Sequence, residues 1–106
     1  MMLRHFRPLV KGALRGFATV ELPSGLVLHD VAIRAGRNGP WASLPSKPVL
    51  DRDGRHRSDT NGRHQYAPVA EWRSRELADR FSAALVELVR AAHPDALNGA
   101  VRRARF

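Results

Sequence analysis

The residues that invite a catalytic interpretation are His29 and Asp30, which are adjacent, with Ser43 and Ser46 a short way along the chain. A Ser-His-Asp triad is defined by geometry, and sequence order supplies none. Neighbouring residues of a strand face opposite ways, so the side chains of His29 and Asp30 could not easily hydrogen-bond. We therefore expect a buried imidazole beside a surface carboxylate, and we predict that the protein is not an enzyme.

A calcium loop is the second chemistry that the spacing invites, because Asp51, Asp53 and Gly54 follow one another as in an EF-hand. That motif needs a third oxygen ligand two residues on and a bidentate Glu at its twelfth position. Those positions hold Arg55 and Gly62, so the calcium interpretation fails. Short polar side chains before a glycine are typical of Asx turns. The expected turn formers are Asp51, Asp53, Asp59 and Asn61.

Other cofactor chemistry has little support. The chain has no cysteine, which excludes disulfides and cysteine-based zinc sites and fits a reducing cytoplasm. His56 and His64 could bind zinc only with ligands from elsewhere. No glycine-rich phosphate-binding motif is present. We predict no metal, no cofactor and no small-molecule substrate.

The strongest functional signal is charge. The chain carries a net charge of +8 over 106 residues, which suits a polyanionic partner such as nucleic acid. A long polar loop over residues 46–64 and the helix after it carry arginines that could reach phosphates. The alternative for both groups is a solvated surface, because acids stand among the arginines. The candidate contacts are Lys47, Arg52, Arg55, Arg57, Arg63, Arg75, Arg80 and Arg90.

Two tryptophans could add base stacking to these phosphate contacts. Trp41 lies shortly before the expected loop in the sequence, and Trp72 lies just before the expected helix. Packing in a core or an interface is the commoner use of such a residue, so both roles stay open.

The elements that must position these residues are three consecutive strands over residues 13–22, 26–35 and 41–44. Residues 23–25 and 37–39, Pro-Ser-Gly and Arg-Asn-Gly, have the composition of hairpin turns. Alternation in the second strand places Val27, His29, Val31 and Ile33 on its core face.

A short fourth strand over residues 65–71 and one helix complete the pattern. Pro68 within that strand indicates an edge position or a bulge. Ser74 is a good N-cap for the helix, apolar residues then recur at helical spacing, and His93 before a proline ends it.

These elements predict an α+β domain, an antiparallel β-meander of three to four strands packed by one C-terminal amphipathic helix. The domain covers residues 13–93, between a flexible basic arm at residues 1–12 and a basic tail at residues 94–106. One helix covers only one face of a sheet, so a partner subunit would cover the other. That second face is expected to carry Phe17, Leu28 and Trp41, and we predict a homodimer.

Three stretches carry a resemblance to a known family. They are FATVELPSGLVLHDVAI, NGPWASLPSKP and YAPVAEW, followed by the amphipathic helix. Together they resemble the SpoVG family (stage V sporulation protein G, or septation protein SpoVG) over about residues 13–92. The resemblance implies a small β-rich dimer that binds DNA, and in some members RNA, in regulatory roles that include septation. Lys47 matches the family's basic position after Pro-Ser, and the loop arginines match in character. The loop is longer here, and both basic ends are extra.

We therefore predict a cytoplasmic, homodimeric regulator that binds DNA or RNA through phosphate contacts from loop, helix and tail arginines. No apolar run is long enough for a membrane span, so no membrane partner is expected. The alternative is a protein-interaction module in septation or regulation that does not bind nucleic acid directly.

Overall fold

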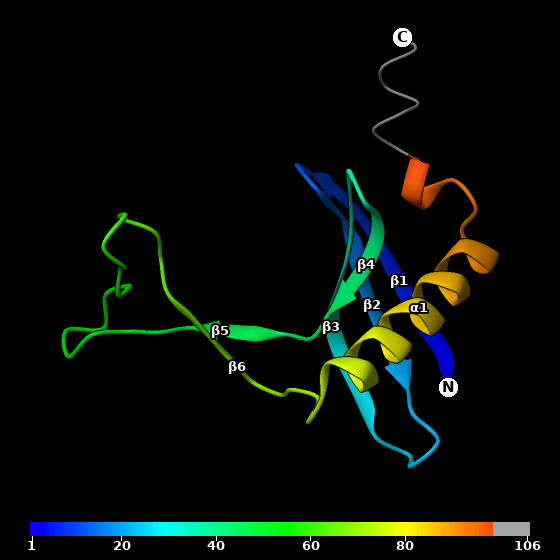
Figure 1. The fold of residues 1–106 in the computed structure, drawn as a ribbon, viewed down its shortest axis with the longest axis horizontal. Helices are drawn as coiled ribbons and strands as arrows, with labels where there is room; N and C mark the ends of the chain where they lie inside the picture. Colours follow the sequence, from blue (N-terminus) through cyan, green and yellow to red (C-terminus); the bar gives the residue numbers. More distant parts are fainter. Residues whose placement is uncertain (99–106) are drawn as a thin grey trace, which may run out of the picture.

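A four-stranded antiparallel sheet carries one helix on one of its faces in the computed structural model, which describes residues 1–98 (Figure 1). The predicted α+β class is confirmed. The sheet has the order β1-β2-β3-β4. Its strands are β1 (Met2–Lys11), β2 (Leu14–Glu21), β3 (Val27–Gly36) and β4 (Gly39–Ser43). The helix is α1 (Arg75–Ala92), and a short 3-10 turn, η1 (Ala96–Asn98), follows it.

Both predicted hairpin turns are confirmed, and each depends on a glycine. In the turn between β2 and β3, the N–H of Leu22 donates to the carbonyl oxygen of Leu26 at 2.8 Å. Gly25 there has φ +93°, and Gly39 in the turn between β3 and β4 has φ +99°. A side chain at either position would be strained.

The N-terminal residues correct the prediction of a flexible arm at residues 1–12. They form β1, an edge strand that pairs with β2 from Met2 opposite Glu21 to Lys11 opposite Leu14. Phe6 is only 4% exposed, and its ring occupies space that any side chain at residue 16 would need. A Cβ on Gly16 would lie 2.5 Å from Cζ of Phe6. Thus Gly16 permits a close approach that docks the strand. One buried residue among basic neighbours left no alternating pattern to detect.

The predicted core face of β3 is also partly wrong. Ala18 pairs with Val31, but Val20 pairs with Leu28, so β3 holds one extra residue at this point. Asp30 adopts φ +56°, the left-handed conformation of a bulged residue. The bulge turns Leu28 toward the core and leaves His29 exposed. An extra residue reverses which side chains face inward, and alternation alone could not reveal it.

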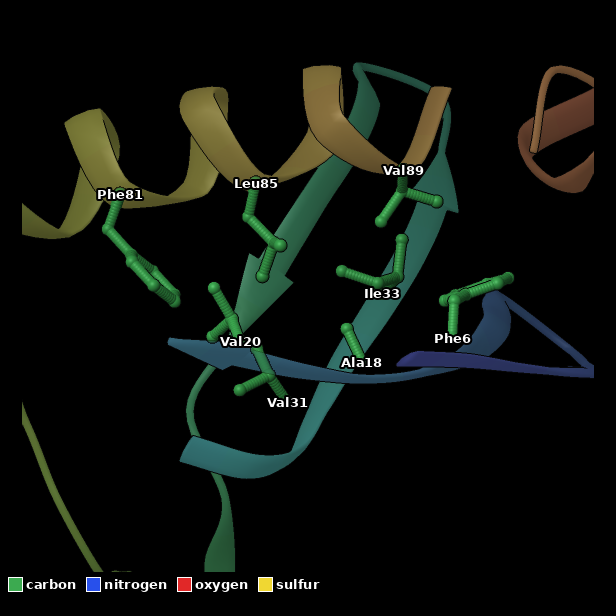
Figure 2. Packing of buried hydrophobic residues seen from close by; sticks show 8 residues of the cluster. All are labelled: Phe6, Ala18, Val20, Val31, Ile33, Phe81, Leu85 and Val89. Carbon is green, nitrogen blue, oxygen red and sulfur yellow. The ribbon is translucent and has the colours of Figure 1, made fainter. Parts of the chain in front are cut away.

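The core lies between the sheet and α1 (Figure 2). The side chains drawn there are Phe6, Ala18, Val20, Val31, Ile33, Phe81, Leu85 and Val89. Burying a large aliphatic side chain contributes about 1.5–3 kcal/mol. The predicted helix is confirmed with its caps, since Oγ of Ser74 accepts from the N–H of Leu77 at 3.3 Å. β4 is tied to α1 by the N–H of Ala42, which donates to Oγ of Ser82 at 2.8 Å.

Residues 46–68 form a projection that we call the arm, which extends away from the sheet and helix (Figure 1). At its base β5 (Ser46–Pro48) pairs with β6 (Tyr66–Pro68) in a separate two-stranded sheet. The predicted fourth strand at residues 65–71 is therefore shorter, and it does not join the main sheet. The fourth strand of the main sheet is β1, which pairs with β2 at the edge.

Candidate nucleic-acid interface

The arm is built from two copies of one turn. Residues 51–56 read Asp-Arg-Asp-Gly-Arg-His, and residues 59–64 read Asp-Thr-Asn-Gly-Arg-His. Oδ1 of Asp51 accepts the N–H groups of Asp53 at 2.8 Å and Arg55 at 3.0 Å. The second turn repeats both bonds, at the same distances, on Oδ1 of Asp59. The predicted Asx turns are confirmed at Asp51 and Asp59, whereas Asp53 and Asn61 take part through their backbone N–H groups. The eight-residue repeat is readable in the sequence, although the prediction of Asx turns did not use it.

The two turns are joined by a ring of three backbone hydrogen bonds. Val49 donates to Gln65 at 2.8 Å, Gln65 donates to Arg57 at 2.7 Å, and Arg57 donates to Val49 at 2.8 Å. These three residues also recur at intervals of eight. The rings of His56 and His64 stack with their centroids 4.2 Å apart and an interplanar angle of 17°. The arm therefore has a backbone held by regular hydrogen bonds, whereas the sequence predicted only a long polar loop.

The five candidate basic residues of the arm are all exposed. Within residues 1–98, the salt bridges of the structure involve none of them. Two of the three acids in the arm, Asp51 and Asp59, use their carboxylates to accept backbone N–H groups of the turns. The charged groups of these basic side chains are thus available to an external anion. These basic residues are Lys47, Arg52, Arg55, Arg57 and Arg63.

The three candidate arginines of α1 have a different environment. Nε of Arg75 lies 3.2 Å from Oδ1 of Asp79, one helical turn away. Arg80 pairs with Glu76 at 2.6 Å, and Arg90 pairs with Glu87. Exposed pairs of this kind contribute about 0–1 kcal/mol each, so they can break. Each of these arginines must still separate from its acidic partner before it binds a phosphate.

The remaining predicted groups are spread over the molecule. Trp72 packs on the core with its ring centroid 5.0 Å from that of Phe81, which is a structural role. Trp41 is 41% exposed on β4. The tail arginines beyond residue 98 lie outside the described residues.

Among residues 1–98, no three His, Asp or Glu side chains gather closely enough to hold a metal ion. In that range no helix combines the length and apolar character that a membrane crossing requires.

Known proteins of similar sequence align with about 58–66% of the chain. The chain is 34% identical over 75 residues to the septation protein SpoVG of Geobacillus thermodenitrificans, which covers 66% of this chain and 78% of that protein. The chain belongs to the SpoVG family. SpoVG 2 of Listeria monocytogenes and SpoVG of Bacillus subtilis are each 35% identical over 66 residues, or 58% of this chain. Those alignments cover 65% and 68% of the two relatives.

The names of these SpoVG relatives refer to septation, and none is the name of an enzyme. No protein-family model matches the chain. No solved structure matches it either. The SpoVG resemblance seen in the sequence is confirmed by the relatives.

Proposed function

We propose that this SpoVG-family protein is a small regulatory protein that binds DNA or RNA, with the arm as its main phosphate-binding element. One observation carries the proposal: the arm presents five exposed basic side chains without ion-pair partners among residues 1–98. Phosphate contacts from Arg and Lys supply most sequence-independent affinity. The net charge of +8 favours the same partner.

The architecture of the arm supports this role. A phosphate-binding arginine acts best from a backbone that is already ordered, because less entropy is lost on binding. The duplicated turns set Arg55 and Arg63 at equivalent positions, each donating its N–H to the Asp that begins its turn. Two equivalent guanidinium groups on one projection suit a partner with a repeating backbone charge. The helix arginines would add weaker contacts.

A homodimer is part of the proposal, and the edge of the sheet supports it. β1 lies at one end of the strand order, so one side of its backbone has no strand partner in the sheet. It also exposes Met2, Leu9 and Val10. Such an edge is suited to pairing with a second chain, and symmetric dimers are the commonest homo-oligomers. Pairing there would place two arms on one particle. Because Leu28 turns inward, the open sheet face has less need of a cover than we predicted.

The direct test is fluorescence anisotropy of the full chain with random duplex DNA, single-stranded DNA and RNA at two salt concentrations. Phosphate-led binding predicts a slope of log K against log salt of about −0.9 for each neutralised duplex phosphate. Binding that is insensitive to salt would overturn the mechanism. Light scattering of the same samples gives the mass of the particle, and a monomer at high concentration would contradict the dimer.

The free edge of β1 also supports the second candidate function, a protein-interaction module. Extended peptides add to exposed sheet edges through main-chain hydrogen bonds. This candidate predicts a stable complex with another protein and no binding to any of the three nucleic acids.

A further inference from the structure

The sheet face opposite α1 carries a row of side chains that crosses all four strands. Arg7 pairs with Phe17, Phe17 with Ala32, and Ala32 with Ser43, and cross-strand partners share a face. The core residues drawn in Figure 2 occupy the other face. We call this side the open face. It is hollowed by about 390 Å³ along this row.

Trp41 stands on the same face in the neighbouring row. It pairs with Arg34 across β3 and β4, two residues from the partner pair of Ala32 and Ser43. A Cβ on Gly36 would lie 3.1 Å from Cζ3 of Trp41, so the indole rests against the backbone of β3. Despite that support, 41% of Trp41 is exposed. The ring is thus held in place by the sheet and still accessible.

Cations flank the two aromatic rings. The guanidinium carbon of Arg7 lies 5.3 Å from the centroid of the Phe17 ring, and Arg34 lines the same hollow. Within residues 1–98, no salt bridge of the structure involves either arginine. Asp30, in its left-handed bulge, is the one acid that lines the hollow. The open face therefore combines aromatic surface with an excess of positive charge.

The hollow is continuous with the arm. Its lining includes Ser43 at the end of β4 and Ser46 at the start of β5. The hollow therefore reaches the base of the arm.

We propose that the open face is a platform for single-stranded nucleic acid, on which a base stacks on Trp41, Arg34 contacts the adjoining phosphate and Arg7, on β1, contacts a phosphate farther along the strand. The inference rests on the proposed function and adds a preference to it. Aromatic side chains on a sheet reach unpaired bases, whereas duplex bases stay stacked on their neighbours. The carboxylate of Asp30 suits the exocyclic amino group of a base, as Asp does with cytosine. The arm binds either form through phosphates, and the platform adds affinity for single strands alone.

The experiment compares Trp41→Leu with Trp41→Phe in the full chain, using single-stranded DNA, RNA of the same length and duplex DNA. Loss of one stacked base predicts about tenfold weaker single-strand binding by Trp41→Leu. Duplex affinity should stay within about twofold, because that partner offers no unpaired base to stack. Trp41→Phe keeps an aromatic ring and should retain most of the single-strand affinity.

A fluorescence measurement reports on the stacking contact itself. Stacking on Trp41 predicts that a single strand quenches tryptophan fluorescence of the wild-type protein and of a Trp72→Phe variant. The quenching should vanish in Trp41→Phe, although that variant still binds. Should Trp41→Leu fail to fold, the double variant Arg7→Gln with Arg34→Gln provides the same comparison, with single-strand affinity falling more than duplex affinity.

The outcomes separate the two proposals. If the wild-type protein binds no nucleic acid, the proposed function and the platform both fail. If it binds, and Trp41→Leu weakens the affinity for single strands and for duplex equally or leaves both affinities unchanged, the platform alone is wrong. If Trp41→Leu instead changes the particle mass in light scattering, the open face joins copies of the chain and the platform is overturned.

Discussion

The arm and helix α1 are both rich in arginine, yet they present it in opposite ways. On α1 the acids stand three or four residues from the arginines, and the helix brings each pair together. In the arm the two turn-forming aspartates accept backbone N–H groups instead. The same residue types therefore give a neutralised surface in one region and free cations in the other. Local backbone geometry, more than composition, decides which arginines an external anion can use.

The two regions also differ in how much their apolar side chains are buried, and so in how much those side chains stabilise the fold. Leu85 on α1 has no exposed surface, whereas Leu50 in the arm is 52% exposed. We expect Leu85→Ala to lower the free energy of unfolding by about 2–5 kcal/mol, because it opens a cavity in the core. Leu50→Ala should change it by less than about 0.5 kcal/mol. Urea denaturation followed by circular dichroism measures both, and equal losses would show that the arm is part of the core.

Removing charge from each region tests the comparison directly. Arg55→Gln with Arg63→Gln should weaken binding to duplex DNA about tenfold and make the salt dependence shallower, because two phosphate contacts are lost. Arg75→Gln with Arg80→Gln removes the same charge from α1 and should weaken binding about twofold. Anisotropy at fixed salt compares the two double variants. If the helix variant lost more affinity, the assignment of the main contacts to the arm would be wrong.

The role of Asp59 can be separated from its charge. Asp59→Ala removes the oxygen that accepts from Asn61 and Arg63, so the turn should open more often. We expect trypsin to cleave the arm about fivefold faster in this variant, as a bond of about 1 kcal/mol implies. Asp59→Asn keeps an acceptor oxygen and is the matched control, with cleavage near the wild-type rate. Equal cleavage of all three proteins would exclude a structural role for this carboxylate.

Releasing an arginine on α1 should have the smallest effect. Glu76→Gln frees Arg80 from its ion pair, and duplex affinity should rise by about twofold, since one more cation becomes available. The same change should lower the free energy of unfolding by less than about 1 kcal/mol. Anisotropy and thermal denaturation measure the two quantities. An unchanged affinity would mean that this face of α1 lies away from the partner.

The sequence predicted the elements whose signals are local. The two hairpins follow from Gly25 and Gly39, and α1 follows from its Ser74 cap and its apolar spacing. The prediction failed at β1, since its docking depends on Phe6 meeting Gly16 ten residues later. It also failed at His29, because the bulge at Asp30 exists only in the register between β2 and β3. For the candidate site, the basic residues were predicted, but the regular backbone structure of the arm was not.

By itself, the sequence determined the turn chemistry, the extent of the helix, the Asx turns and the excess of positive charge. Each of these depends on residues a few positions apart, whose interactions form whatever the rest of the chain does. Only the tertiary structure decided that β1 completes the sheet, that Leu28 and not His29 faces the core, and that Trp41 stays exposed on the open face. Those outcomes depend on which strands pair and in which register, and such contacts join residues that are distant in the chain.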